Sequence, residues 1–343
     1  MTRTTIPDIA AQSGLSTATV DRALNGRAGV SAINRHRVLE TARQLGYLPH
    51  EGLLPMPARP ARLAVLLPTP ERAFLARLAE GISARAEAHP LVAACPIIPL
   101  SGIGPGALLA GIDALPPGTE AVGLVTTDHP KSRAAITRLA ESGVKVVTLA
   151  TDLSETKRAF YVGVDNRAAG RTAARILSLL APEAGDVAVF AGSQAFLGHQ
   201  EREMGFREVL EANSSLTVLP TVETMEDAAR LRSEVAATLR QRPTLSAIYC
   251  LGAGRSGIIE ALQGRVSRPV VVLHDLTPTS RRWLAEGRID AIVDQNAELL
   301  AEQAILHLLG AVAGSPAALA LKHVDARLIL RENLPPDSRE TRR

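Results

Sequence analysis

The chain has 343 residues, of which 46% are hydrophobic and 21% are charged. This length is enough for two or three domains, and the composition excludes a chain that is disordered throughout. No apolar run approaches the ~20 residues that a membrane span needs, and the first residues lack the apolar segment of a secretory signal. We therefore expect a cytoplasmic protein without membrane contact, in which Cys95 and Cys250 are buried reduced thiols.

The positive charge is concentrated at one end of the chain. The formal net charge is +3, and residues 1–60 hold seven arginines and four acidic residues, so the remaining chain is neutral. A small basic segment joined to a neutral body favours a polyanionic partner for that segment, although an excess of three charges is small.

Residues 1–48 predict a helix-turn-helix domain of three short helices. Thr5, Ser16 and Ser31 stand where side-chain oxygens cap helices over 6–12, 17–24 and 32–45. Gly14 permits a sharp turn between the first two helices. We expect these helices to bury a common set of side chains: Ile6, Ile9, Ala10, Val20, Ala23, Leu24, Ile33, Val38, Ala42 and Leu45.

A stiff linker is predicted over residues 49–61, because four prolines in this stretch oppose helix formation. Beyond it, short apolar runs alternate with amphipathic stretches, which is typical of βαβ units with parallel sheets. Strands are predicted at 63–68, 121–127, 144–150, 160–165, 186–193, 246–254, 269–275 and 290–295. Helices are predicted between them, at about 73–89, 131–142, 167–180, 202–212, 256–262, 279–286 and 297–313.

These strands are too many for one small sheet, so residues 62–335 are predicted to form an α/β core of two Rossmann-like lobes. We expect an N-lobe over about 62–162 plus 295–323, a C-lobe over about 163–292 plus 324–335, and a frayed tail at 336–343. Ligands of such sheets bind at the carboxyl ends of the strands, which places a binding cleft between the lobes.

The segment "TTIPDIAAQSGLSTATVDRALNGRAGVSAINRHRVLETARQLGYLP" resembles the headpiece of the LacI/GalR family of bacterial transcription regulators. The core segments "YVGVDNRAAGRTAARIL", "GHQEREMGFREVL" and "HDLTPTSRRWLAEGRIDAIVDQN" resemble the core of that family, which is similar to periplasmic sugar-binding proteins. The resemblance implies a homodimeric repressor that reads a pseudo-palindromic operator and responds to a sugar, sugar acid or polyol. It implies no enzymatic activity and no cofactor.

By this resemblance the second helix reads bases with Thr17, Ala18 and Arg22. An arginine suits a bidentate contact to guanine, and the alanine and threonine methyl groups suit a thymine methyl. Phosphate contacts are expected from residues at the helix starts, in addition to their capping role. These residues are Thr5, Ser16, Ser31, Asn34 and Arg35.

Asp21 is unusual on a helix that faces DNA, because its carboxylate repels phosphate and the family more commonly has a serine there. Asp21 either holds Arg22 or Arg27 in position, or is a tolerated solvated charge that lowers affinity, or accepts a hydrogen bond from a cytosine amino group. We take the first as our hypothesis, because both arginines lie close to Asp21 in the sequence.

The resemblance also assigns effector-binding residues, since a sugar site needs planar donors and acceptors together with an aromatic face. The residues assigned are Phe74, Arg202, Asp275 and Gln295, with Thr151 and Asp152 in an ambiguous register. Arg72 and Arg255 depart from the family pattern. They indicate either an acidic ligand, such as a sugar acid or a phosphate, or two side chains that point to solvent.

Three further expectations concern the linker, the oligomer and rival classes. Pro55 and Pro57 break any helix, so we expect no regular hinge helix over 51–58. Tetrameric members of the family that the chain resembles carry a leucine-heptad tail, which this tail lacks, so the resemblance implies a dimer. A sugar-binding protein or sensor remains the alternative function. An enzyme is disfavoured because the sequence contains no phosphate-binding loop, dinucleotide fingerprint, metal-ligand cluster or nucleophile elbow.

Overall fold

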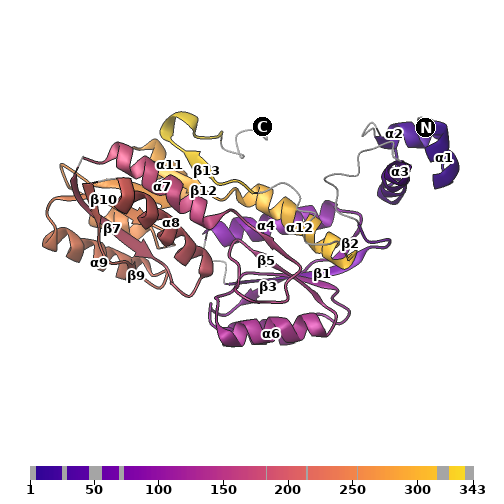
Figure 1. Cartoon of the computed structure of the whole chain (residues 1–343), viewed down its shortest axis with the longest axis horizontal. Coiled ribbons are helices and arrows are strands. Elements are labelled where there is room, and N and C mark those ends of the chain that lie inside the picture. Colours follow the sequence, from indigo (N-terminus) through magenta and orange to yellow (C-terminus); the bar gives the residue numbers. More distant parts are fainter. Residues whose placement is uncertain are drawn as a thin grey trace.

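A computed structural model describes most of the chain. The residues described are 5–24, 29–45, 56–68, 73–182, 184–213, 215–252, 254–314 and 324–336. They form a small helical domain followed by two α/β lobes (Figure 1). The prediction about a hinge helix over 51–58 falls mostly outside the described residues, and residues 56–60, which lead into the first strand, are not helical.

The N-terminal domain consists of the three predicted helices α1 (Ile6–Ser13), α2 (Thr17–Leu24) and α3 (Ala32–Gln44). Two of the three predicted caps are present: the Ser16 hydroxyl accepts a hydrogen bond from the Thr19 N–H at 3.2 Å, and the Ser31 hydroxyl accepts one from the Asn34 N–H at 3.3 Å. The predicted Thr5 cap was wrong, because the Thr5 hydroxyl donates to Asp8 Oδ2 at 2.6 Å instead of accepting from the helix backbone. Gly14 ends α1 in the left-handed region, with φ of 68°. The glycine turn therefore sets the angle between α1 and α2.

The three helices share one small hydrophobic core, and one predicted member of it was wrong. Ile9, Val20 and Val38 are fully buried. Ile33 is 53% exposed, because it stands five residues before Val38, which is about 140° around the helix from that buried position. The face that α3 buries is therefore defined by residues after Ile33.

The N-lobe has a parallel sheet in the order β2-β1-β4-β5-β6, in which β3 also pairs with β1. Its strands are β1 (Ala61–Pro68), β2 (Val92–Ala94), β3 (Ile97–Leu100), β4 (Ala121–Leu124), β5 (Lys145–Leu149) and β6 (Phe160–Val162). Its helices are α4 (Ala73–Ala88), α5 (Pro105–Asp113), α6 (Pro130–Glu141) and α12 (Ala297–Val312). Residues of β1 and β4 are buried on both faces, as a sheet covered by helices on both sides requires.

The C-lobe has a sheet in the order β13-β12-β11-β10-β7-β8, in which β9 also pairs with β7 and only β13 is antiparallel. Its strands are β7 (Ala184–Ala191), β8 (Ser215–Val218), β9 (Val222–Glu223), β10 (Leu245–Cys250), β11 (Val270–His274), β12 (Ala291–Asp294) and β13 (Arg327–Ile329). Its helices are α7 (Asn166–Leu180), α8 (Leu197–Asn213), α9 (Ala228–Gln241), α10 (Ser256–Ala261) and α11 (Pro278–Ala285), and a 3-10 turn spans Arg331–Asn333.

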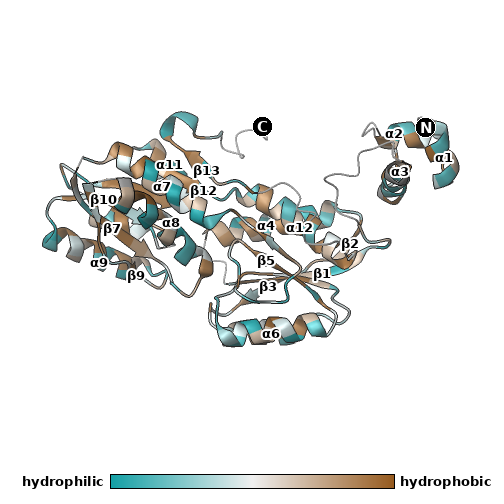
Figure 2. Ribbon diagram, viewed as in Figure 1, coloured by the Kyte–Doolittle hydropathy of each residue, from teal (hydrophilic) through white to brown (hydrophobic). Residues whose placement is uncertain are grey.

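The chain passes between the two sheets three times: after β6, after β12, and between α12 and β13. The predicted lobe boundaries lie near these passages and stay a prediction. All eight predicted strands are present, whereas the short edge strands and the helices α5 and α9 were not predicted. Hydrophobic residues concentrate on the strands, and hydrophilic residues on the outward sides of the helices (Figure 2).

Helices α7 and α8 touch each other backbone to backbone through two glycines. A Cβ atom added to Gly170 would lie 2.0 Å from the carbonyl oxygen of Arg202, and one added to Gly205 would lie 2.0 Å from that of Arg167. No side chain larger than hydrogen fits at either position without moving a helix. This crossing therefore fixes the position of Arg202 in the lobe.

Both cysteines are free thiols, as predicted. Cys250 is buried, and burial raises the pKa of its thiol to about 11. Cys95 is only partly buried, in contrast to the prediction, and the burial of its thiol raises the pKa to about 12.

No helix in the described ranges is long and apolar enough to cross a membrane.

Candidate functional site

The described residues enclose a pocket at the carboxyl ends of strands from both sheets. The space between the lining residues has a volume of about 600 Å³, which includes a part that is open to solvent. The N-lobe contributes Ala73, Phe74, Leu75, Val125, Ala150 and Thr151. The C-lobe side contributes Phe196, Gly198, His199, Arg202, Glu226, Leu251, Gly252, Arg255, Asp275 and Gln295.

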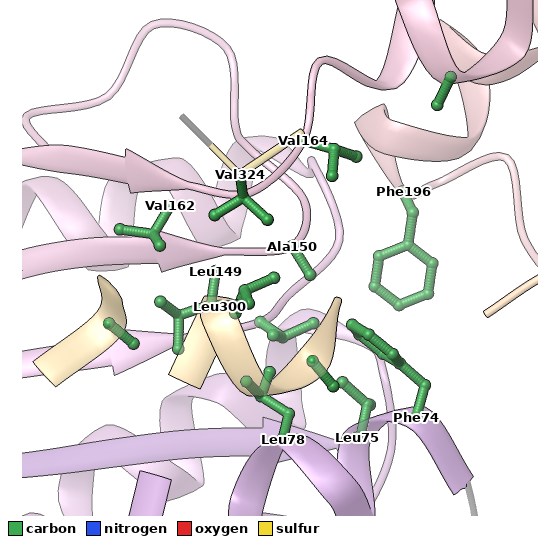
Figure 3. Packing of buried hydrophobic residues seen from close by; sticks show 14 of the residues in the cluster. Phe74, Leu75, Leu78, Leu149, Ala150, Val162, Val164, Phe196, Leu300 and Val324 are labelled. Atoms are coloured by element: carbon green, nitrogen blue, oxygen red, sulfur yellow. The ribbon is translucent and has the colours of Figure 1, made fainter. Parts of the chain in front are cut away.

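Two phenylalanines supply the apolar surface of the pocket. Phe74, at the start of α4, and Phe196, just before α8, are 9% and 4% exposed and come from different lobes. Their rings point toward each other across the pocket (Figure 3). Both residues belong to one cluster of buried hydrophobic side chains, so an aromatic surface forms the apolar part of the pocket wall.

Arg202 supplies a fixed donor on the C-lobe side. Its Nε donates to Asn166 Oδ1 at 2.8 Å and its Nη1 donates to the carbonyl of Leu251 at 3.2 Å, while the residue is 4% exposed. Asn166 in turn donates to the hydroxyl of Tyr161 at 3.0 Å, and burial raises the pKa of this tyrosine well above its usual range. The guanidinium is therefore held in one orientation at the pocket wall.

Asp275 and Gln295 form a pair of acceptors at the ends of β11 and β12. Gln295 Nε2 donates to Asp275 Oδ1 at 2.7 Å, and both residues are buried. Burial raises the pKa of Asp275, although the nearby guanidinium groups of Arg255 and Arg202 oppose this shift. Within the described residues Gln295 Oε1 has no hydrogen-bond partner, so a buried acceptor is left for a ligand.

Three residues at these strand ends adopt left-handed backbone conformations. Ala150 follows β5 with φ of 59°, Asp275 follows β11 with φ of 66°, and Asn296 follows β12 with φ of 53°. Such conformations cost free energy in non-glycine residues and persist where the surrounding structure enforces them, which is common at ligand sites.

The lobes also contact each other directly beside the pocket. The Asp128 N–H donates to the Ala195 carbonyl at 2.7 Å, and the Gly198 N–H donates to Thr151 Oγ1 at 3.0 Å. Arg77 of α4 donates to the carbonyl of Leu276. These hydrogen bonds join the two lobes beside the pocket.

Six of the eight residues assigned to the effector site line this one pocket: Phe74, Thr151, Arg202, Arg255, Asp275 and Gln295. Asp152 does not line it, because its carboxylate pairs with Arg158 and accepts from Thr148 Oγ1 at 2.7 Å. Arg72 lies outside the described residues.

Sequence reasoning missed Phe196, His199 and Glu226, which also line the pocket. Phe196 and His199 follow the predicted strand over 186–193, so the rule that ligands bind at strand ends was a usable signal for both. Glu226 follows a two-residue edge strand, β9, and no pattern in the sequence marks it.

A second surface lies on α2 of the N-terminal domain. Thr17, Ala18 and Arg22 are exposed, whereas Val20 and Ala23 face the core, as predicted. Asp21, which precedes Arg22, is partly buried. Arg27 lies outside the described residues.

The helix starts combine exposure with structural hydrogen bonds. Thr5, Ser16 and Ser31 are exposed, and Asn34 is partly buried. Arg35 donates from Nη1 to the Ala23 carbonyl at 2.9 Å and thereby joins α3 to the end of α2. This bond gives Arg35 a structural role in the domain, beside the predicted phosphate contact.

Comparisons with known proteins agree with the two parts of the fold. The family model for bacterial regulatory proteins of the lacI family matches residues 5–50. The family model for the periplasmic binding protein domain matches residues 111–316. Catabolite control protein A of Priestia megaterium is 37% identical over 79 residues, which cover 23% of this chain and 24% of that protein. The chain thus matches about a quarter of the length of this curated relative.

Solved structures share the fold of the core. A solute-binding protein from Burkholderia graminis in complex with D-arabinose has a TM-score of 0.74 and 22% identity, covering 81% of this chain and 97% of that one. A solute-binding protein from Bacillus halodurans with bound myo-inositol has a TM-score of 0.73 and 16% identity, covering 81% and 97%.

These likenesses confirm the predicted fold class of a helix-turn-helix headpiece joined to a two-lobed α/β core. The chain belongs to the periplasmic binding protein domain family, whose model matches more than half of it, and it begins with a helix-turn-helix domain of the lacI family of bacterial regulatory proteins.

Proposed function

We propose that the protein is a repressor that binds a pseudo-palindromic operator as a homodimer and changes its DNA affinity when a sugar, sugar acid or polyol enters the core pocket. The second helix of each headpiece enters a major groove, and the twofold axis of the dimer matches the symmetry of the operator. Contact between cores, rather than between the small headpieces, holds the dimer together.

The observation that carries the proposal is the chemistry of the pocket in a chain that has a DNA-binding headpiece. Phe74 and Phe196 offer two aromatic faces for the C–H sides of a sugar ring. Arg202, Asp275 and Gln295 offer planar donors and acceptors for pairs of hydroxyl groups. Two solute-binding proteins of the same fold hold D-arabinose and myo-inositol, which supports a ligand of the size of a single sugar ring.

A sugar-binding protein or sensor without a role in transcription is the second candidate, because the core alone has the fold of solute-binding proteins. The exposed Thr17, Ala18 and Arg22 on one face of α2 favour the regulator. A duplex-binding assay separates the two candidates, since only the regulator binds DNA from its own promoter region.

Ligand binding is expected to raise thermal stability. A sugar, sugar acid or polyol at 100 times its dissociation constant adds about 2.7 kcal/mol to the free energy of unfolding, because it binds only the folded state. Differential scanning fluorimetry with a panel of pentoses, hexoses, polyols and sugar acids measures this. Equal melting temperatures with every member of the panel would count against the proposed ligand class.

The variant Arg22→Ala is expected to weaken operator binding by about 1–3 kcal/mol and to relax discrimination at one base pair, because a bidentate contact to guanine is lost. Fluorescence anisotropy with duplexes from the promoter region and single-base variants of them measures both effects. Arg37→Ala, an exposed arginine on α3, is the matched control and should affect all duplexes alike. Undiminished discrimination in Arg22→Ala would remove this residue from base reading.

Asp21→Ser tests whether the acid orients the neighbouring arginine. If Asp21 holds Arg22 in place, the serine variant loses discrimination between the operator and single-base variants at every salt concentration. A salt series separates this from a change in phosphate attraction, which is screened by salt. Stronger binding to all duplexes with unchanged discrimination would reject the orienting role.

A further inference from the structure

The end of the linker is attached to the N-lobe by an ion pair. Arg59 Nη2 donates to Glu120 Oε1 at 2.8 Å, and Arg59 Nη1 donates to Glu120 Oε2 at 3.2 Å. Glu120 Oε2 also accepts from the Arg62 N–H at 3.0 Å. One carboxylate therefore holds both the end of the linker and the start of β1. Because the guanidinium makes two parallel hydrogen bonds, the pair fixes a direction as well as a distance.

Apolar contacts attach the same segment. Pro57 is buried, and Met56 is partly buried and packs against the hydrophobic cluster that contains residues of β1 and α4. Pro57 and Pro60 have no N–H, so the main chain cannot donate a hydrogen bond at these two positions. Side chains therefore hold residues 56–60 on the N-lobe. We call Met56, Pro57, Arg59 and Glu120 the linker clamp.

Strand β4 connects the linker clamp with the core pocket. Glu120 directly precedes β4, and Val125, directly after it, lines the pocket. The Glu120 N–H donates to the Arg62 carbonyl at 2.8 Å, and the Val125 N–H donates to the Leu66 carbonyl at 3.1 Å, so both ends of β4 are bonded to β1. All four residues of β4 are buried. In a close-packed interior such a short strand moves as a unit, so a displacement at Val125 reaches Glu120.

The C-lobe is bonded close to the pocket end of β4. The Asp128 N–H donates to the Ala195 carbonyl at 2.7 Å, and Ala195 precedes Phe196, which lines the pocket. A ligand that changes the position of the C-lobe relative to the N-lobe thus acts on the end of β4 that lies opposite to Glu120.

We infer that the linker clamp transmits the state of the core pocket to the headpieces, and that the ion pair between Arg59 and Glu120 is its decisive contact. This inference rests on the proposed function and adds the contact that couples its two sites. Both residues are positioning residues, since neither lines the pocket. The Arg59 side chain is 73% exposed, and exposed ion pairs contribute little to the free energy of unfolding. Loss of the pair should therefore change the coupling and leave the fold intact.

Two variants of the full chain with opposite changes of charge test the inference. The DNA response is the ratio of the dissociation constants for a promoter duplex with and without a saturating probe. The probe is whichever of D-arabinose, D-galactose, D-glucuronate and myo-inositol raises the melting temperature most. Arg59→Gln and Glu120→Gln should each reduce the DNA response from at least tenfold to less than threefold.

The same variants should keep the wild-type melting temperature and the wild-type affinity for the probe in the absence of DNA. The double variant should lose no more of the DNA response than either single variant, because the two side chains act as one unit. Lys157→Gln and Glu141→Gln are the matched controls. They remove either charge of an exposed ion pair of the same lobe, with a distance of 2.6 Å, and should keep the wild-type response.

The opposite charges also separate the linker clamp from a direct contact with DNA. If Arg59 bound a phosphate, Arg59→Gln would weaken DNA binding equally with and without the probe, and Glu120→Gln would not weaken it. That result, or a wild-type response in both variants, would overturn the inference and leave the proposed function standing. If no probe raises the melting temperature, or if the wild type itself shows no DNA response, the proposed function and this inference fail together.

Discussion

Replacing Arg202 by methionine is expected to weaken binding of the core ligand by about 2–5 kcal/mol, which is a factor of at least ~30 in the dissociation constant. The side chain is 4% exposed, and two hydrogen bonds, to Asn166 Oδ1 and to the Leu251 carbonyl, fix its orientation before a ligand arrives. A donor that is already oriented loses little entropy on binding. Methionine keeps much of the apolar stem but donates no hydrogen bond.

The matched control is Arg207→Met on the same helix. Arg207 pairs with Glu203 at 2.8 Å and does not line the pocket, so this variant should keep the wild-type ligand affinity. Calorimetric titration measures both variants, and circular dichroism checks that each is folded. Wild-type affinity in Arg202→Met would contradict the assignment of Arg202 as a ligand donor.

Gly170→Ala is expected to destabilise the protein by about 3 kcal/mol, because the new methyl group meets the carbonyl oxygen of Arg202 at 2.0 Å. A backbone carbonyl cannot rotate away, so α7 and α8 must separate. Since that carbonyl belongs to Arg202, the variant should also weaken ligand binding. Thermal unfolding should show a decrease in melting temperature of roughly 6–12 °C, at ~2–4 °C for each kcal/mol.

Gly106→Ala is the control for this prediction. Gly106 lies in the first turn of α5, and a Cβ atom added there meets nothing within 4 Å. Alanine is a better helix former than glycine, so this variant should be neutral or more stable by about 0.5–1 kcal/mol. A Gly170→Ala variant as stable as Gly106→Ala would show that the α7–α8 crossing tolerates a larger separation than the structure indicates.

The headpiece was predictable because its determinants are local. Ser16 and Ser31 each cap a helix that begins at the next residue, and Gly14 ends the helix before it, so the three helices follow from neighbouring residues. Ile33 was misplaced because it was counted as apolar without regard to its angle from Val38 around α3. Local composition gives the existence of a helix, and only the periodicity gives its buried face.

The pocket was predictable where a strand ends and a polar residue follows at once. Asp275 and Gln295 directly follow β11 and β12, so the strand assignment places both at the site. The neighbouring pair Thr151 and Asp152 was ambiguous, because the left-handed Ala150 before them turns the chain in a way that no sequence pattern indicates. The structure shows that Thr151 lines the pocket and that Asp152 pairs with Arg158.

Other features depend on distant contacts. Arg255 was predicted to meet either an acidic ligand or solvent. The solvent alternative was wrong, because the side chain is buried and its Nη1 donates to the carbonyls of His274 and Asp275, some twenty residues later. Helix α9 was missed although Leu231, Val235 and Leu239 recur every four residues, a pattern that indicates a helix with one buried face.

The central claim is that a small ligand in the core pocket controls DNA binding by the headpieces. Its most direct test is the dissociation constant for a duplex from the promoter region, measured with and without a saturating sugar, sugar acid or polyol that raises the melting temperature. We predict at least a tenfold change in DNA affinity for the wild type, and none for Arg202→Met under the same conditions, although that variant still binds DNA. Equal DNA affinity of the wild type with and without the stabilising ligand would contradict the account.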